Sequence, residues 1–511
     1  MRDIESNIAN SREPTLERYA ESVEQFLQRH KFAVIVVLSV VYFGGSMLRA
    51  RGKPFWFDEI LTVLAARQPT YSATIQAARE LDLTPPFTDL VAHTVNRVAG
   101  SGEVVFRLPS MVGFWTFCLC LFGFAARRVN MVFALSAMLL PFVTSGESYS
   151  IEARSYGMML GFCGIALWSW QTAGLGQNRV VSLLGLVLGI GGAVVCHSYA
   201  VLIYLPLVGA EALRSVRLRK IDKAVWGAFV VALIPVVWTM LWVMRVAREN
   251  PHFVAQATRK DYLVYYLSVF GPSLWFLIPA LLLCATWLAA GCNEEKPPLA
   301  SGPPRVPDYE LLAAALFWLI PVAAITLALI VPPHSFFDRY ALPSIGGFAL
   351  TTVFLADHFA GERRALGMAF AFPVFLLFLF TMTHGRRLEN PFQEEPILTA
   401  AIKQAPVVVN NYVSYLQLWY YAPEDVRSRL LYLSDEGSSV KYSHIDDIMQ
   451  PFQKFGVPVV NYAEFATSGK EFFLYFTAGL GWVPDRVLED GGSVQVVNWA
   501  QGKALLQLRV K

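Results

Sequence analysis

Long apolar segments joined by short polar connections constrain this chain more than any other feature of its sequence. A helix needs about 20 consecutive apolar residues to cross the hydrocarbon core of a bilayer, and the chain of 511 residues contains about eleven such segments. Only 16% of its residues are charged, whereas a soluble domain carries about 25%. We therefore expect a polytopic α-helical membrane protein. The expected spans are residues 32–49, 105–126, 131–146, 156–173, 181–196, 199–213, 224–245, 263–290, 310–331, 340–358 and 365–384.

Basic residues in the connections predict the orientation of these spans, because short cytoplasmic loops carry an excess of lysine and arginine. With residues 1–31 in the cytoplasm, the basic connections fall on the same side, notably the one at 214–223. Residues 1–31 show no pattern of a cleavable signal, so we expect the first apolar run to be a retained helix. This orientation sends residues 50–104 and the C-terminal segment 390–511 to the outer face. The net charge of +3 gives no indication of a nucleic-acid partner.

The two outer regions have patterns of their own. Residues 50–104 show short amphipathic helical patterns, interrupted at Pro69 and at Thr84-Pro85-Pro86, and we expect these helices to lie along the membrane surface. Residues 390–511 are more polar and alternate helical with strand-like patterns, which predicts a small α/β domain. We therefore predict a cytoplasmic segment 1–31, a transmembrane domain 32–389 and an extracytoplasmic domain 390–511. The expected outer helices are 60–67, 70–82 and 87–99, and the expected strands are 407–409, 430–433, 471–476, 494–498 and 504–510.

The sequence PFWFDEI at residues 54–60 places two adjacent acids, Asp58 and Glu59, just beyond the first span. Carboxylates beside a membrane are costly unless they face water or a partner, so the pair is a candidate functional site. A structural interpretation is equally open. Asp58 would then be the N-cap of the helix that follows, with Glu59 favoured by the helix dipole.

Further polar clusters interrupt the apolar background at the ends of later spans. One is ESYSIEARSY at 147–156, and another is PPHSFFDRYALPS at 332–344. Each alone is typical of a snorkelling anchor or a local salt bridge. Together with Asp58 they fall on one side of the membrane and indicate a polar pocket for an anionic, membrane-resident substrate. A third and smaller cluster contains His197, which we interpret as a satisfied interfacial histidine. The candidate site residues of the two larger clusters are Glu152, Arg154, Tyr156, His334, Arg339 and Tyr340.

Five short motifs occur in an order that resembles the polyprenyl-phosphate-sugar-dependent glycosyltransferases of the C superfamily (GT-C). They are similar to bacterial relatives of protein O-mannosyltransferase and of the aminoarabinose transferase that modifies lipid A. The resemblance covers about residues 50–345. Two positions depart from it, since many relatives have His-Pro-Pro where this chain has Thr84-Pro85-Pro86, and Gln-Glu-Ala-Arg where it has Ile151-Glu152-Ala153-Arg154. The motifs are PFWFDEI, TPPF from Thr84, EVVFRLPS from Glu103, IEARSY and DRYALPS.

The resemblance implies an inverting glycosyltransferase in the cell inner membrane that acts at its outer face, in assembly of the cell envelope. Carried over to this chain, it implies catalytic roles for Asp58, Glu59 and Glu152 and phosphate binding by Arg154 and Arg339. The chemistry is consistent with this, because transfer needs a base near the acceptor hydroxyl and the departing prenyl phosphate suits guanidinium donors. The predicted substrate-binding residues are completed by Tyr156, His334 and Tyr340.

The expected partners are a polyprenyl-phosphate-linked sugar donor, a glycan, lipid or protein acceptor, and membrane lipids. Oxygen atoms of Asp58, Glu59 and Glu152 are ligands that a divalent metal accepts, so a metal cofactor stays open. A transporter or flippase of polyprenyl-linked glycans is the alternative function, and it predicts inverted repeats that we do not find in the sequence. A membrane scaffold would leave the acids of the outer loop unexplained.

Overall fold

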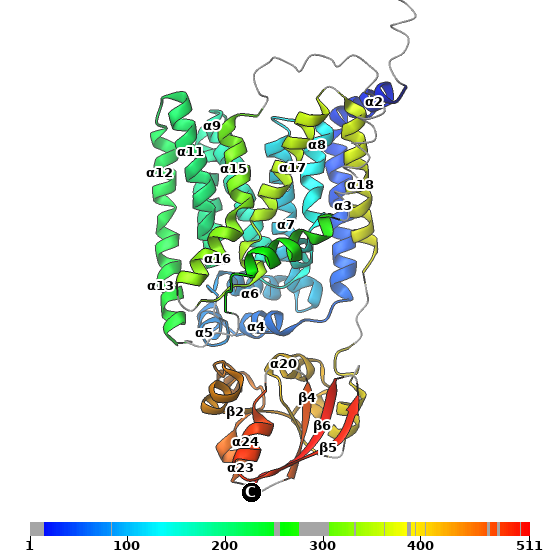
Figure 1. The fold of residues 1–511 in the computed structure, drawn as a ribbon, viewed down its shortest axis with the longest axis vertical. Coiled ribbons are helices and arrows are strands. Elements are labelled where there is room, and N and C mark those ends of the chain that lie inside the picture. The colour runs from blue at the N-terminus through cyan, green and yellow to red at the C-terminus, as the bar shows by residue number, and fades with distance from the viewer. Residues whose placement is uncertain are drawn as a thin grey trace, which may run out of the picture.

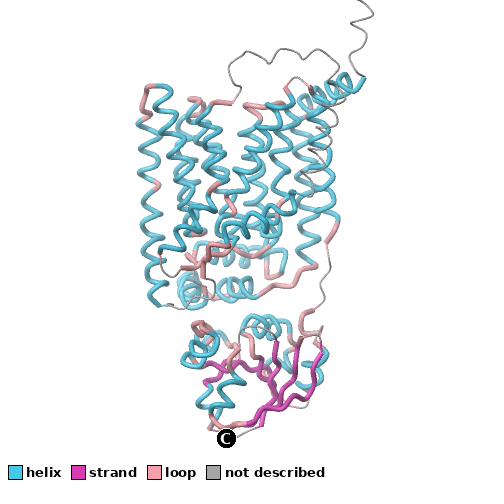
Figure 2. The backbone as a smooth tube through the Cα atoms, in the orientation of Figure 1, coloured by secondary structure: helices cyan, strands magenta, loops and turns pink. Residues whose placement is uncertain are grey.

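The chain forms a bundle of apolar helices with a small sheet domain at one end (Figure 1). In Figure 2 the long strands lie in that domain, whereas the bundle is helical. The computed structural model describes residues 15–82, 84–249, 256–274, 306–331, 334–361, 363–385, 390–393, 395–403, 405–467, 471–477, 481–500 and 502–511.

The bundle contains long helices on both sides of several broken ones. Residues 261–274 are also helical, and residue 274 is the last described residue of this segment. The helices of the bundle are α2 (Thr15–Arg29), α3 (Lys31–Arg51), α7 (Glu103–Ala125), α8 (Met131–Leu139), α9 (Tyr156–Gly174), α10 (Arg179–Cys196), α11 (Tyr204–Leu218), α12 (Lys223–Val231), α13 (Leu233–Glu249), α15 (Asp308–Trp318), α16 (Ile320–Ile330), α17 (Ser344–Ala360) and α18 (Arg364–Thr383), with the 3₁₀ turns η1 (Leu140–Val143), η2 (Ser145–Ile151), η3 (Ser198–Ile203) and η4 (Asp338–Ala341).

By length and composition, six helices in the described residues can cross a membrane, or up to eight if each of two bent pairs is one span. The expected spans 131–146 and 310–331 coincide with these bent pairs, which turn by 79° and 47°. In the second pair Pro321 opens α16, where its missing N–H costs the helix no hydrogen bond. The second half of the expected span 263–290 lies outside the described residues. The expected count of eleven therefore stays a prediction. The unbent candidates coincide with the expected spans 32–49, 105–126, 181–196, 199–213, 224–245 and 365–384.

Three short helices form a layer at the end of the bundle that faces the sheet domain (Figure 1). They are α4 (Phe57–Ala66), α5 (Tyr71–Leu81) and α6 (Phe87–Ala99), and all three were expected from the sequence. Thr70 caps α5 by accepting a hydrogen bond from the N–H of Ala73 at 3.1 Å. Their apolar faces pack together, with Ile60, Val63 and Ala77 buried.

Glycines bring α7 and α9 together more closely than larger residues would allow. A Cβ on Gly157 would lie 2.3 Å from the carbonyl oxygen of Ser110, and a Cβ on Gly161 would lie 2.6 Å from that of Gly113. Small residues four positions apart let helix backbones approach in this way. At the same end of the pair, the Ser110 hydroxyl donates a hydrogen bond of 2.5 Å to the carbonyl of Arg154. The close crossing therefore fixes the loop that carries Arg154 against α7.

The C-terminal domain is built on a mixed sheet of six strands in the order β3-β2-β1-β4-β6-β5. Strand β1 pairs in parallel with β2 and β4, β2 pairs in parallel with β3, and β6 pairs antiparallel with β4 and β5. The expected α/β domain is confirmed, although strand β3 was not predicted. The strands are β1 (Val407–Val409), β2 (Leu430–Ser434), β3 (Val459–Asn461), β4 (Glu471–Thr477), β5 (Ser493–Ala500) and β6 (Lys503–Arg509), and the helices are α19 (Pro396–Ile402), α20 (Tyr412–Tyr421), α21 (Glu424–Arg427), α22 (Glu436–Ser438), α23 (Tyr462–Ala466) and α24 (Val483–Glu489), with the turns η5 (Ser439–Ser443) and η6 (Gln450–Phe455).

Helix α20 joins the sheet domain to the bundle. The N–H of Phe55 donates to the Tyr421 hydroxyl at 2.5 Å, and the amide of Gln417 donates to the Phe55 carbonyl at 3.0 Å. The rings of Phe57 and Tyr412 meet edge to face, 5.2 Å apart. These contacts seat the domain directly on the segment that carries Asp58.

Candidate functional site

Helix α4 begins at Phe57 with Trp56 as its extended N-cap residue, so Asp58 and Glu59 both lie in its first turn. The interpretation of Asp58 as the N-cap is therefore wrong. Consecutive residues of a helix point about 100° apart, and the two acids consequently face different surroundings. Glu59 is fully buried, whereas the Asp58 side chain is 14% exposed.

Glu59 is held in a buried ion pair with Arg107 of α7. Both carboxylate oxygens accept from the guanidinium, at 2.7 and 2.8 Å, and neither side chain is exposed. The N–H of Ala153 donates to the same carboxylate at 2.7 Å, and the N–H of Trp56 at 3.3 Å. Arg107 also donates to the carbonyl of Lys53 at 2.5 Å. These contacts fit a positioning role for Glu59, which ties α4, α7 and the loop before α9 into one unit.

Asp58 faces Arg339, which comes from η4 at the far end of the sequence. Their closest atoms, Oδ2 and Nη2, lie 3.1 Å apart, although the direction does not make a hydrogen bond. The Arg339 guanidinium also lies over aromatic rings, 4.2 Å from that of Phe337, 5.5 Å from that of Trp56 and 5.9 Å from that of Tyr156. Such stacking orients a guanidinium and leaves its edge available to an anion.

Arg154 lies buried beside this pair, but it already has an acidic partner. Its guanidinium donates to both oxygens of Asp82, at the end of α5, and to the hydroxyl of Thr62 at 3.2 Å. It also donates to the carbonyl of Asp58 at 3.2 Å. Its Nε–H has no hydrogen-bond partner in the described part of the chain. Arg154 thus holds α4 and α5 in place and offers one free donor.

Asp82 and Asp89 are two buried acids of the outer helices whose pKa values are shifted in opposite directions. Burial raises the pKa of Asp82, but the charge and hydrogen bonds of Arg154 outweigh it and the pKa is lowered. Burial raises the pKa of Asp89 well above its usual range, and the nearby charge of Asp82 raises it further. Neither oxygen of Asp89 has a partner among the described residues. Asp89 therefore keeps its proton to a higher pH than Asp82 does.

Glu152 lies at the start of the loop that leads to α9. Its Oε1 is 3.2 Å from the Nζ of Lys53, and its Oε2 has no partner among the described residues. The three predicted catalytic acids each face a different cation, because Asp58 faces Arg339 and Glu59 faces Arg107. No group of three or more His, Cys, Asp or Glu side chains in the described chain is arranged to hold a metal ion. The acids do not gather as the ligand set that a divalent metal would need.

Aromatic side chains form one wall beside Arg339. Tyr340 stacks on Tyr199 with ring centres 4.8 Å apart, and it lies 4.7 Å from the ring of His197. His197 is buried, and its Nδ1 has no hydrogen-bond partner among the described residues, so its interpretation as a satisfied histidine is wrong. Predicted His334 differs from this group because its side chain is exposed and its Nδ1 lies 3.0 Å from the Ala328 carbonyl.

Unpartnered donors are the most informative feature of this region. Buried polar atoms in folded proteins are nearly always hydrogen-bonded, and a group of exceptions calls for an explanation such as a missing ligand. Three N–H donors without partners in the described chain belong to residues that surround Asp58, which are Trp56 (Nε1), Arg154 (Nε) and Arg339 (Nε). Two of them carry positive charge. Their chemistry suits an anion with several oxygen acceptors.

Four residues of this region were not predicted from the sequence as site residues, namely Lys53, Trp56, Asp82 and Arg107. Trp56 and Arg107 lie inside the motifs PFWFDEI and EVVFRLPS. The motifs mark these positions, but they do not indicate what the two side chains do. Asp82 directly precedes the Thr84-Pro85-Pro86 break, where a helix was expected to end. Arg107 and Lys53 depend on partners 48 and 99 residues away, in the pairs Arg107–Glu59 and Lys53–Glu152.

The fold is similar to that of solved membrane-protein structures, although no family model matches the chain and no curated protein matches it in sequence. ArnT from Cupriavidus metallidurans in the apo state aligns with a TM-score of 0.56 at 13% identity, covering 94% of this chain and 98% of that one. The same protein bound to undecaprenyl phosphate aligns with a TM-score of 0.54 at 14% identity and the same coverage. The chain therefore shares the fold of these solved ArnT structures, as the resemblance of its motifs led us to expect.

Proposed function

We propose that this protein is an inverting glycosyltransferase that moves a sugar from a polyprenyl-phosphate donor to an acceptor hydroxyl at the outer face of the membrane. The observation that carries the proposal is the group of unpartnered N–H donors of Trp56, Arg154 and Arg339 around the carboxylate of Asp58. A phosphate accepts such donors, and a carboxylate beside it is in reach of an incoming hydroxyl. The solved structure of ArnT with undecaprenyl phosphate, which shares the fold, supports a lipid phosphate as the anion.

In the proposed reaction Asp58 is the general base. The acceptor oxygen attacks the anomeric carbon of the donor sugar from the side opposite to the phosphate, and its proton passes to the Asp58 carboxylate. The bond between the anomeric carbon and the phosphate oxygen breaks, and the prenyl phosphate leaves with that electron pair. Attack from the opposite side inverts the configuration at the anomeric carbon. Cations fixed where negative charge grows typically lower such a barrier by several kcal/mol.

Arg339 is proposed to change partners when the donor binds. Without a ligand it faces Asp58 at 3.1 Å. A phosphate that takes over the guanidinium leaves the Asp58 carboxylate free for the acceptor hydroxyl. The base thus becomes available only when the donor is in place.

The other predicted residues are given supporting roles. Glu152, with one free carboxylate oxygen, is placed to accept a hydrogen bond from a hydroxyl of the sugar. Tyr156 stacks beneath Arg339, and Tyr340 belongs to the aromatic wall on which a sugar ring can pack. Glu59 is assigned a positioning role through Arg107. The exposed His334 is assigned to binding of the donor phosphate.

The outer orientation of the site is part of the proposal. The site and the sheet domain share one end of the bundle, and α2 lies at the other (Figure 1). Basic residues gather near α2, where Arg364 pairs with Glu21, as expected for a cytoplasmic end. We accordingly place the protein in the cell inner membrane, with the domain 390–511 outside.

Two substitutions separate the proposed roles of base and phosphate ligand. Asp58→Asn is expected to lower transfer from a polyprenyl-phosphate sugar by about 10²–10⁴-fold, while the binding of polyprenyl phosphate stays near wild type. Arg339→Ala is expected to weaken that binding. Transfer is measured with purified protein in detergent by mass spectrometry of the glycosylated acceptor, and binding by a lipid-retention assay. Asp425→Asn, at an exposed acid of the sheet domain, is the matched control.

Full transfer by Asp58→Asn would contradict its role as base. Wild-type protein that moves the lipid-linked sugar across vesicle membranes without forming a glycosidic bond would instead favour the alternative function, a flippase. The glycosylated acceptor and the transported lipid-linked sugar are measured in the same vesicles, so the two functions are distinguished directly.

A further inference from the structure

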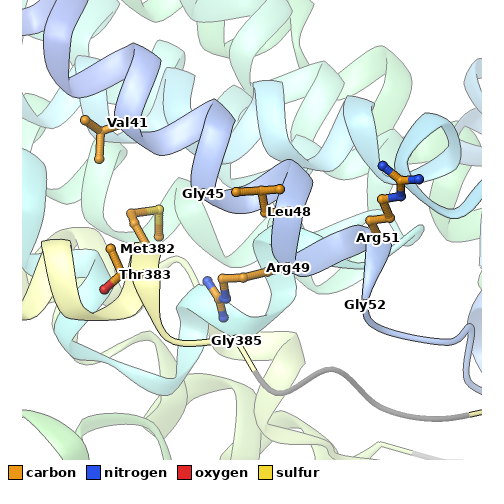
Figure 3. Close-up of a pocket in the computed structure, with 9 residues that line it drawn as sticks. All are labelled: Val41, Gly45, Leu48, Arg49, Arg51, Gly52, Met382, Thr383 and Gly385. Atoms are coloured by element: carbon orange, nitrogen blue, oxygen red, sulfur yellow. The ribbon is translucent and has the colours of Figure 1, made fainter.

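A pocket lies between the end of α3 and the end of α18 (Figure 3). Its volume is 730 Å³, within the range of about 300–1,000 Å³ that is typical of ligand sites. Neither Asp58, Trp56, Tyr156 nor Arg339 lines it. It is therefore separate from the site proposed for the donor. The residues that line it are Val41, Gly45, Leu48, Arg49, Arg51, Gly52, Met382, Thr383 and Gly385.

One face of α3 forms the apolar wall of this pocket. Val41, Gly45 and Leu48 follow one another at intervals of three or four residues, so they share a face of the helix, and Gly52 is its C-cap residue. A Cβ on Gly45 would lie only 2.8 Å from the Cβ of Met382, which shows how closely α18 approaches here. Leu48 is 74% exposed although it is large and apolar.

The surroundings of the pocket are suited to hydrocarbon. On α3 the side chains of Val37 and Val40 are exposed, and on α18 those of Leu376 and Phe380 are exposed. Both helices pass the length and composition criteria for a membrane span. Exposed apolar side chains on such helices are expected to face lipid chains, so the apolar wall of the pocket continues a surface suited to hydrocarbon.

The polar end of the pocket carries excess positive charge. Arg49 pairs with Glu147 through both carboxylate oxygens, and Lys53 pairs with Glu152. The exposed Arg51 has no ion pair among the described residues. Figure 3 shows Arg49 beside Gly385 and Arg51 on the other side of the last turn of α3. A guanidinium has five N–H donors, so Arg49 can bind an anion while it keeps Glu147.

We infer that this pocket binds an anionic phospholipid of the surrounding membrane. The lipid phosphate lies against the Arg49 guanidinium, where Arg51 adds attraction. The acyl chains run past Leu48 and Met382 into the bilayer. This combination of a cationic end and an apolar wall at the end of a membrane span is the chemistry that recognises an anionic lipid.

The lipid also reaches the loop that holds the proposed active site. Glu147, the partner of Arg49, belongs to η2, and the same loop continues through Glu152 to Ala153, whose N–H binds Glu59. A phosphate on Arg49 therefore sits on one end of the segment that positions Glu59. The inference does not depend on the proposed transfer reaction.

The experiment measures retained lipid by native mass spectrometry of the full chain. Protein is reconstituted in nanodiscs with equal amounts of phosphatidylglycerol and phosphatidylcholine, and released in mild detergent. Wild-type protein is expected to keep phosphatidylglycerol in preference to phosphatidylcholine. Arg51→Gln is expected to reduce this preference about fivefold, since a basic residue near the surface contributes about 1 kcal/mol. Leu48→Trp, which fills the pocket from an exposed position, is expected to reduce retention of both lipids.

Lys220→Gln is the matched control, because Lys220 is an exposed cation next to α11 that does not line the pocket. Equal retention of the two lipids by wild-type protein would overturn the inference, and so would undiminished retention by Leu48→Trp. Displacement of phosphatidylglycerol by added undecaprenyl phosphate would also overturn it, because the pocket would then belong to the donor site. Transfer activity is not read out, so a failure here leaves the proposed function untouched.

Discussion

At the scale of single residues, two consecutive acids take different roles because they occupy different faces of α4. Glu59 accepts four hydrogen bonds from Arg107, Ala153 and Trp56 and is fully buried. Asp58 faces the Arg339 guanidinium, and its Oδ2 atom has no hydrogen-bond partner among the residues that the structure describes. A fully paired carboxylate has no capacity left for a substrate proton, whereas a carboxylate in contact with one cation can exchange that partner.

Substituting Glu59 is expected to affect stability more than Asp58→Asn does. Glu59→Gln removes the negative charge and leaves the buried Arg107 guanidinium uncompensated, which costs about 3–5 kcal/mol in comparable pairs. The measurement is the thermal unfolding of the purified protein in detergent. Glu424→Gln, at an exposed acid, is the control and is expected to change the free energy of unfolding by less than about 0.5 kcal/mol. An unchanged melting temperature for Glu59→Gln would contradict the positioning role.

The raised pKa of Asp89 predicts a pH dependence of stability. Below about pH 4 both folded and unfolded chains carry the proton on this carboxyl. Above that pH the unfolded chain loses it first, so stability falls as the pH rises toward the folded pKa. Asp89→Asn is therefore expected to raise the melting temperature at pH 8 and to match wild type near pH 4. Each unit by which the pKa is raised corresponds to about 1.4 kcal/mol.

Asp82 works in the opposite direction, because its pKa is lowered. It stabilises the folded chain above about pH 4, and that contribution is lost as the pH falls further. The two acids therefore act in separate pH ranges. A destabilising effect of Asp89→Asn at pH 8 would show that Asp89 is ionised and paired in the folded protein.

At the scale of elements, the close crossing of α7 and α9 fixes the position of the loop that carries Arg154. Gly157→Ala would place a methyl group 2.3 Å from the Ser110 carbonyl oxygen, and the helices must move apart to accept it. We expect a loss of about 1–3 kcal/mol in the free energy of unfolding and a reduced rate of transfer. Gly227→Ala in α12 is the control, since nothing lies within 4 Å of its Cβ position. Alanine there is expected to be neutral or stabilising by up to about 1 kcal/mol.

Thermal unfolding and transfer assays on the two glycine variants separate packing from helix propensity. Equal stability of Gly157→Ala and wild type would mean that the crossing is more tolerant than its geometry indicates.

At the scale of the whole molecule, the sheet domain is attached to the bundle next to the site. Tyr421→Phe removes the hydroxyl that accepts from the Phe55 N–H at 2.5 Å and donates to Glu103 at 3.3 Å. An unpaired N–H at a partly buried contact costs about 1–3 kcal/mol. We expect faster amide hydrogen exchange in residues 55–66 and 412–421, together with slower transfer. Tyr442→Phe, whose hydroxyl binds Glu489 on an exposed surface, is the control and is expected to change neither.

Unchanged exchange in Tyr421→Phe would indicate that the aromatic contacts of Phe57 with Tyr412 suffice to hold the domain.

The residues of the candidate site could be predicted only in part. Asp58, Arg339 and Tyr156 were found from the sequence because charged and polar residues stand out at the ends of apolar spans, and the structure brings these three together. Asp82 was missed, since an acid at the end of an amphipathic helix is ordinary until its partner is known. The same holds for Arg107, whose span gave no indication that its guanidinium turns inward to Glu59.

Local pattern alone determined the helical membrane architecture, the three outer helices and the α/β character of the C-terminal domain. Those features follow from the periodicity of apolar residues and from breakers such as Pro69, which act over a few neighbouring positions. The tertiary structure decided which acidic and basic side chains form pairs. Arg339 and Asp58 are separated by 280 residues and come within 3.1 Å only because the helices fold back on one another. Burial then makes each such pairing selective, since an ion without a partner is costly away from water.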